Sequence, residues 1–218
     1  MSIVPKFVNY FWRYFQGQVG SNKKGIGKMS NDRRCIFGID PGLGGGISYY
    51  IPELNHLTYM VMPTKIQYDE NDIDSVAVEQ LFTTLKTSFD IIVYIEEVHA
   101  IFGSSAASTF SFGYGYGKVV GIIESLHIPI GFVQPKKWQS MVWRSSDIIK
   151  KPDVLKPDGK IKKGKINTKE STINAVKRLY PNETFLATKK SKKIHDGITD
   201  SLAILQFGLI MEGIEKTF

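Results

Sequence analysis

From residue 34 onward, short continuous apolar runs alternate with stretches in which apolar residues recur at helical spacing. The apolar runs predict buried strands at residues 35–39, 47–51, 57–62, 91–95 and 130–133. The periodic stretches predict helices at residues 76–88, 110–126, 135–142, 168–180 and 195–210. Three strands come first, and helices and strands then alternate. This order predicts an α/β protein with a mixed five-stranded sheet flanked by helices.

Two stretches do not share this pattern. Residues 1–33 join an aromatic segment to a Gly/Ser/Lys linker, so we expect a basic, flexible N-terminal extension outside a domain that spans residues 34–218. Residues 143–167 are rich in Lys, Pro, Asp and Gly and lack periodicity, which predicts a long, exposed basic loop.

Composition adds limits on class and location. Hydrophobic residues make up 42% of the chain and charged residues 22%, which is ordinary globular usage. The single cysteine, Cys35, has no disulfide partner and indicates a reducing compartment. No apolar run reaches the roughly 18–20 residues of a membrane span, so no membrane partner is expected. We expect a cytoplasmic protein, or an organellar one if residues 1–33 are a transit segment.

The net charge of +7 is unevenly distributed. Residues 35–135 carry three basic and eleven acidic side chains, whereas residues 136–193 carry 17 basic and five acidic ones. An acidic body joined to a strongly basic block indicates an anionic partner. The alternative is that the basic block is simply a solvated surface.

Four acids occupy positions at which a buried carboxylate would be costly. Asp40 follows the first strand, Glu96 ends the strand at 91–95, and Asp196 and Asp200 lie one turn apart on the last helix. Such carboxylates need cations or hydrogen-bond donors, and Mg²⁺ prefers oxygen ligands. Two such ions can activate a water and stabilise the departing oxygen of a phosphodiester. Glu97 competes with Glu96, because alternation along the strand separates the two without deciding between them.

Three motifs carry a resemblance to a known family. They are Phe37–Gly42 (FGIDPG), Tyr94–Val98 (YIEEV) and His195–Ala203 (HDGITDSLA). In this order and at these separations they resemble the RuvC-type Holliday-junction resolvases of the RNase H-like superfamily. The stretch Phe112–Gly117 (FGYGYG) and the four-residue gap between the last two acids look closer to the phage and plastid branch, since the typical bacterial enzyme has a three-residue gap.

The resemblance implies an RNase H-like fold and a homodimeric, Mg²⁺-dependent endonuclease that nicks opposing strands of a four-way DNA junction. It implies two ions per site, with Mn²⁺ as a substitute for Mg²⁺. Carried over by motif, the metal ligands are Asp40, Glu96, Asp196 and Asp200.

The resemblance also implies residues that contact DNA. Lys137 matches the basic residue near the scissile region, with Lys136 as a one-position alternative. The loop after Glu96 stands where related enzymes wedge a side chain into the junction, and Phe102 is the candidate, with core packing as its alternative. Because the acidic body repels phosphate, the basic block must supply DNA affinity. Its expected DNA-binding residues are Lys150, Lys151, Lys160, Lys162, Lys163, Lys165, Lys192 and Lys193.

Three glycines recur every four residues on one predicted helix, at Gly113, Gly117 and Gly121. They predict either close packing of that helix on its own sheet or a helix–helix contact in the expected homodimer. Two other function classes remain open. The glycine-rich turn after Asp40 also resembles the first phosphate loop of actin-like ATPases and sugar kinases. A non-catalytic DNA-binding module is the third reading, although it leaves the other acids unexplained.

Overall fold

The computed structural model of the chain describes residues 33–67, 69–98, 105–155, 157 and 159–215. The predicted N-terminal extension, apart from Arg33, lies outside these described residues, as does Phe102.

The central layer is a five-stranded sheet with the strand order β3-β2-β1-β6-β7. The first three strands form an antiparallel meander, and β6 and β7 run parallel to β1. The bounds are β1 Arg34–Asp40, β2 Gly46–Ile51, β3 His56–Val61, β6 Asp90–Glu96 and β7 Ile130–Val133. The predicted mixed five-stranded sheet is therefore confirmed.

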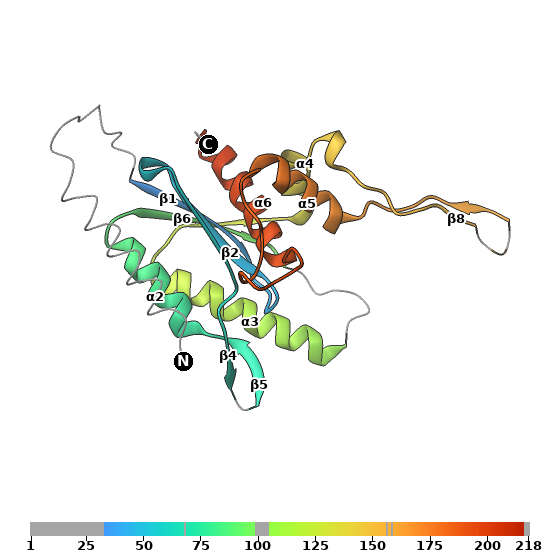
Figure 1. The fold of residues 1–218 in the computed structure, drawn as a ribbon. Helices are drawn as coiled ribbons and strands as arrows, with labels where there is room; N and C mark the ends of the chain where they lie inside the picture. The colour runs from blue at the N-terminus through green and yellow to red at the C-terminus, as the bar shows by residue number, and fades with distance from the viewer. Residues whose placement is uncertain (1–32, 68, 99–104, 156, 158, 216–218) are drawn as a thin grey trace.

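Helices cover both faces of this sheet (Figure 1). On one face lie α2 (Ser75–Lys86) and α3 (Ala106–Ser125), packed on the apolar residues of one hydrophobic cluster. On the other lie α4 (Pro135–Val142), α5 (Thr168–Leu179) and α6 (Asp196–Met211). None of the helices in the described part of the chain has both the length and the hydrophobicity needed to cross a membrane. The α/β fold class is confirmed.

α6 lies directly on the backbone of β1 and β2. A methyl group on Gly38 would lie 2.2 Å from the backbone nitrogen of Leu205, and one on Gly46 would lie 2.5 Å from the carbonyl oxygen of Gly197. Only glycine permits such an approach. The contact places the first turn of α6 beside the end of β1, which positions the candidate site.

The structure contains two hairpins that the hydrophobic pattern does not predict. β4 (Thr64–Gln67) pairs only with β5 (Glu70–Ile73), outside the main sheet. Within the stretch predicted as a basic loop, β8 (Val154–Leu155) pairs with β9 (Ile161–Lys162), and a 3-10 turn spans Ser145–Asp147. These strands are short and mostly exposed, so burial leaves little mark on their sequence.

α3 begins four residues before its predicted start. Ser105 caps it, because the Ser105 hydroxyl accepts a hydrogen bond from the backbone N–H of Ser108 at 3.1 Å. The first turn of α3 therefore consists of small residues whose helical character depends on this cap, and no apolar periodicity announces it.

Candidate functional site

Two of the four predicted acids end neighbouring parallel strands. Because Ile39 of β1 pairs with Ile95 of β6, Asp40 and Glu96 lie level with each other at the carboxyl edge of the sheet. Alternation puts both on the face that α6 covers, since Ile36 and Tyr94 belong to the cluster on that face.

The other two acids come from the first two turns of α6. Asp196 is the first residue of the helix, and Asp200 lies one turn further on, half-buried. A methyl group on Gly197 would lie 2.3 Å from the carbonyl carbon of Gly45, so this turn touches the loop after β1. Backbone contact therefore brings the carboxylates of α6 close enough to interact with Asp40.

The pKa values of Asp40, Glu96 and Asp200 are raised. Burial raises the pKa of Asp40 to about 7, and the charges of Glu96 and Asp196 add to the rise. Burial likewise raises the pKa of Asp200 to about 7, with further contributions from Asp40, Glu96 and Asp196. Burial also raises the pKa of Glu96. The negative charges of these acids thus repel one another, and the cations and hydrogen-bond donors of the protein do not fully offset that repulsion.

The donor set suits a hydrated divalent cation. Among the described residues, no three His, Cys, Asp or Glu side chains form a ready-made metal cage. Mg²⁺ rarely uses such a cage, since it keeps several waters and takes substrate phosphate oxygens as further ligands. Oxygen-only donors with raised pKa values, held near one another but not in contact, fit an ion of this kind.

Glu96 and Glu97 face opposite sides of the sheet. Glu96 accepts a hydrogen bond from the indole N–H of the buried Trp138 at 2.9 Å, on the face of α6. Burial and the charge of Glu97 both raise the pKa of Tyr116 on α3, on the other face. Only Glu96 therefore lies with the other three acids, and Trp138 holds its carboxylate in place.

Lys169 lies at the carboxylate site, although the sequence did not predict it there. It lies in the first turn of α5 and forms an ion pair with Asp196. The side chain of Thr172, one turn along α5, lowers the pKa of Asp200. A lysine in the first turn of a helix opposes the helix dipole, and this unfavourable placement was the available signal for Lys169.

The structure does not bring Lys137 to the carboxylates. Its ammonium nitrogen lies 5.9 Å from the ring centroid of Phe207, near the C-terminal half of α6. Among the described residues, no ion pair joins Lys137 or its exposed neighbour Lys136 to an acid of the site. Trp138, the next residue along α4, is the one that reaches Glu96.

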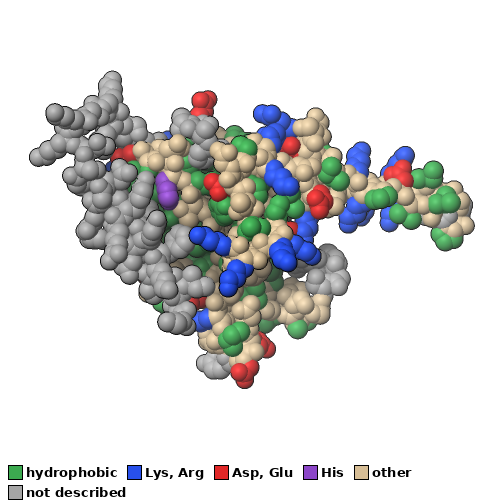
Figure 2. Space-filling view, viewed as in Figure 1, with side chains coloured by type: hydrophobic (Ala, Val, Ile, Leu, Met, Phe, Trp, Pro, Cys, Tyr) green, Lys and Arg blue, Asp and Glu red, His purple; other side chains and the backbone are tan. Residues whose placement is uncertain are grey.

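Six of the predicted DNA-binding lysines of the basic block, those between residues 150 and 165, lie on a projecting two-stranded ribbon (Figure 1). Pairing begins at Lys150 with Ile166 and continues to Leu155 with Ile161. Figure 2 shows lysine and apolar side chains along this arm. Lys192 and Lys193, which precede α6, are exposed. The six predicted residues of the ribbon are exposed as well: Lys150, Lys151, Lys160, Lys162, Lys163 and Lys165.

The base of this ribbon is held firmly to the body. Arg178 of α5 makes an ion pair with the buried Asp147 at 2.6 Å and donates to the carbonyl of Val142 at 3.0 Å. The hydroxyl of Ser171 accepts from the backbone N–H of Ile149 at 2.9 Å. The ribbon therefore leaves the body from a fixed point beside α5, the helix that also carries Lys169.

No protein-family model and no curated protein sequence matches the chain. Among solved structures, the chain is similar to Thermus thermophilus RuvC, with 15% identity over 84% of this chain and 98% of that chain, at a TM-score of 0.45. A T. thermophilus RuvC in complex with a Holliday junction substrate matches with 12% identity, the same coverage and a TM-score of 0.44.

The assignment of the fold rests on the sheet itself, in which an antiparallel meander is followed by two parallel strands. The fold is RNase H-like. The closer resemblance to the phage and plastid branch stays a prediction.

Proposed function

We propose that the chain is a structure-selective endonuclease that resolves four-way DNA junctions by paired, metal-dependent nicks. The observation that carries this proposal is the gathering of Asp40, Glu96, Asp196 and Asp200 from two strands and one helix, where the charges of the neighbouring acids help to raise the pKa values of Asp40 and Asp200. Four carboxylates kept close at such a cost in repulsion are useful chiefly to bind cations.

Mg²⁺ would be held by these four carboxylates, two ions to a site, with Mn²⁺ as a substitute. When bound, the ions supply an activated water and stabilise the departing oxygen of the phosphodiester. Trp138 fixes the Glu96 carboxylate through its indole N–H. The backbone N–H of Gly42 donates to the Asp40 carboxylate at 3.5 Å, which orients that group at the end of β1.

Lys169 is suited to bind the phosphate backbone at this site. Its side chain and that of Asp196 are 60% and 42% exposed, so their ion pair is weak and easily exchanged. When a phosphate approaches, the ammonium can turn from Asp196 to a non-bridging oxygen. Lys169 therefore takes the position near the scissile phosphate that the sequence assigned to Lys137.

The ribbon supplies a way to hold a DNA duplex. Paired residues share a face and faces alternate, so Lys150 and Lys162 lie on one face and Lys151, Lys163 and Lys165 on the other. A surface that lies against one phosphate strand needs lysines on one face only. Lysines on both faces suit a two-stranded ribbon in a major groove, which has phosphates on either side.

Neutralising the ribbon is expected to weaken junction binding and to flatten its salt dependence. With the six ribbon lysines changed to Gln, the slope of log K against log salt should fall by about 3 to 5, since each phosphate contact contributes about 0.9. Filter binding or fluorescence anisotropy between 50 and 200 mM salt measures this slope. Lys86→Gln, on α2 across the sheet, is the control and should leave the slope unchanged. An unchanged slope in the ribbon variant would show that the basic block is only a solvated surface and does not bind DNA.

Paired nicks need two sites, and an exposed stripe on α3 suits a second copy of the chain. Methyl groups on Gly113, Gly117 and Gly121 would meet no atom of the described residues within 4 Å. Packing of α3 on its own sheet therefore does not require these glycines. Close approach of another helix does require small residues, which favours the homodimer reading.

Gly117→Trp is expected to convert a dimer to a monomer, because the indole would hold a second helix away. Sedimentation equilibrium should give a mass near 24.6 kDa for the variant and twice that value for the wild type. Gln80→Trp on the exposed side of α2 controls for a surface tryptophan and should stay dimeric. A Gly117→Trp variant that remains dimeric would show that the interface lies elsewhere.

The kinase-like alternative receives no support from the glycine-rich loop. A methyl group on Gly45 would lie 2.1 Å from the carbonyl oxygen of Asp40, and Gly46 and Gly197 are in backbone contact. Packing against α6 thus accounts for these glycines without a phosphate.

The direct test of function is Mg²⁺-dependent nicking of a synthetic four-way junction, compared with a linear duplex of the same sequence. ATP hydrolysis is measured alongside. Cleavage of junction and duplex at equal rates would contradict the selectivity for branched DNA.

A further inference from the structure

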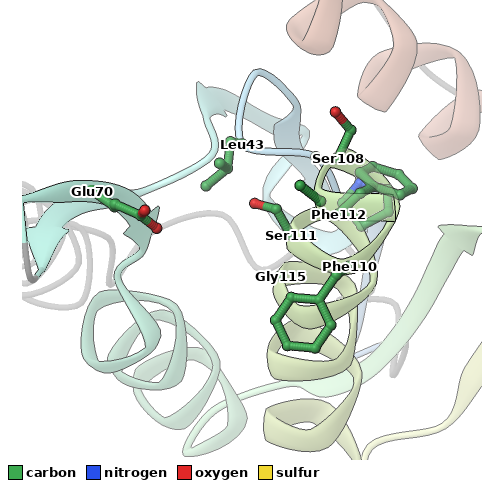
Figure 3. A pocket seen from close by; sticks show the side chains of 10 residues that line it. Leu43, Glu70, Ser108, Phe110, Ser111, Phe112 and Gly115 are labelled. Carbon is green, nitrogen blue, oxygen red and sulfur yellow. The ribbon is translucent and has the colours of Figure 1, made fainter. Parts of the chain in front are cut away.

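A cavity of about 640 Å³ borders the loop Pro41–Leu43, directly after Asp40 (Figure 3). Glu70 of β5 stands on one wall, and Ser108, Ser111 and Phe112 from the first turns of α3 stand on the other. A cavity of this size is typical of small-molecule sites. Metal-dependent nicking at the four carboxylates gives this cavity no role.

The two walls are tied together. Lys118 of α3 forms an ion pair with Asp72 of β5. Between the walls, a methyl group on the buried Gly115 would lie 3.3 Å from the side chain of Ile73, so helix and hairpin are in direct contact. The β4–β5 hairpin, which pairs with no strand of the main sheet, is thereby held at a set position opposite α3.

The lining selects a neutral, flat, partly polar group. Leu43 and Phe112 offer apolar surface, Ser108 and Ser111 offer hydroxyls, and Glu70 offers a carboxylate. The carboxylate repels phosphate and accepts hydrogen bonds from amino groups. An aromatic face, hydroxyls and an acceptor together match a nucleobase with an exocyclic amino group, because bases stack favourably on aromatic side chains.

The cavity adjoins the carboxylate site through Gly42. Gly42 donates its backbone N–H to the Asp40 carboxylate, and a methyl group on Gly42 would lie 3.6 Å from the ring of Phe112. One residue thus separates the proposed metal site from the aromatic wall. A strand whose phosphate lies at the carboxylates would bring the adjoining base to this wall.

We propose that the cavity receives an unpaired nucleobase adjoining the scissile phosphate and helps to select where the strand is cut. This inference rests on the proposed nuclease function. Ser111 and Phe112 position the base, and Glu70 favours the bases that carry an exocyclic amino group (cytosine, adenine and guanine) over thymine.

The test couples a change in the protein to a change in the DNA. Ser111→Trp fills the cavity, and an abasic nucleotide beside the nick removes the base; Thr83→Trp on exposed α2 is the matched protein control. Binding and single-turnover nicking are measured for wild type and both variants, on the intact junction and on junctions with an abasic nucleotide at each position flanking the nick. At one flanking position, we expect Ser111→Trp alone and the abasic nucleotide alone each to weaken binding or slow nicking by about tenfold. The two changes combined should have no larger effect than either one alone, because both remove the same contact.

Two results would overturn the inference: effects that multiply at every flanking position, or a Ser111→Trp variant that behaves like Thr83→Trp. Glu70→Gln should in addition reduce the preference for the three bases that carry an amino group over thymine at the same position. If wild type nicks no junction, the proposed function fails, and the binding constants of the same protein–DNA pairs still decide whether the cavity holds a base.

Discussion

Asp40→Asn is expected to slow junction nicking by roughly 10³-fold while leaving junction binding nearly unchanged. A neutral amide is a poor ligand for Mg²⁺, so the variant loses the ions that supply the activated water and stabilise the departing oxygen. The basic ribbon, which we propose holds the DNA, is untouched. Single-turnover nicking with saturating Mg²⁺ and anisotropy on the same junction separate the two quantities.

Asp90→Asn is the matched control, because Asp90 is exposed at the opposite end of the strand that carries Glu96. It should nick at the wild-type rate. Nicking by Asp40→Asn within a few fold of wild type would contradict the assignment of Asp40 as a metal ligand.

Without divalent metal, the same carboxylates are expected to destabilise the protein as pH rises. The folded-state pKa of Asp40 and Asp200 is about 7, above the ordinary value of 3.8, so the folded state binds more protons than the unfolded state between about pH 4 and 7. The free energy of unfolding therefore falls across this window, by about 4 kcal/mol for a carboxyl whose pKa rises from 3.8 to about 7.

Urea unfolding of wild type and Asp40→Asn at pH 5 and pH 7, with EDTA and with Mg²⁺, measures this effect. Comparison with the variant removes contributions common to both proteins, such as that of His56, whose pKa is lowered by burial. In EDTA at pH 7 the variant should be the more stable protein, and Mg²⁺ should abolish its advantage. A wild type more stable than the variant in EDTA at pH 7 would contradict the repulsion among the carboxylates.

Gly38→Ala is expected to reduce the free energy of unfolding by about 3 kcal/mol or more and to abolish nicking. The added methyl group would lie 2.2 Å from the backbone nitrogen of Leu205 and 2.3 Å from the carbonyl oxygen of Ser201. Both are backbone atoms, so only a shift of α6 relieves the clash, and overpacking of this kind costs more than a side-chain rearrangement. The shift moves Asp196 and Asp200 away from Asp40.

Gly44→Ala, in the loop after β1, provides the control. A methyl group there meets nothing within 4 Å, and the backbone is not in the left-handed region that only glycine adopts easily. Its free energy of unfolding should stay within about 0.5 kcal/mol of wild type. Equal stability of the two variants in urea would show that α6 does not rest on the backbone of β1.

Buried segments could be predicted from the sequence because burial on a sheet or helix face leaves a periodic record. β1, β6 and α4 follow their apolar patterns closely, and α4 matches its predicted bounds. The four acids could be placed together for the same reason, since Asp40 and Glu96 end well-marked strands and Asp196 and Asp200 lie one turn apart at the start of a well-marked helix. Alternation separated Glu96 from Glu97, but only the position of α6 determines which of the two faces the other acids.

Features that depend on tertiary contact left no such record. Lys169 reaches Asp196 because α5 packs against α6, and nothing local to α5 specifies that contact. Lys137 and Trp138 are neighbours in sequence, yet burial turns the indole towards Glu96 and leaves the lysine exposed. The β4–β5 hairpin is held by its contacts with α3, which join residues more than forty positions apart.

Strand-resolved mapping of the cuts on a four-way junction tests the central claim most directly. Each strand is labelled in turn, the junction is incubated with the protein and Mg²⁺, and the products are sized and then treated with ligase. Paired nicking predicts cuts at symmetrical positions on two opposing strands, with ends that ligase seals into two duplexes. Cuts confined to one strand, cuts at unrelated positions, or ends that cannot be sealed would contradict it.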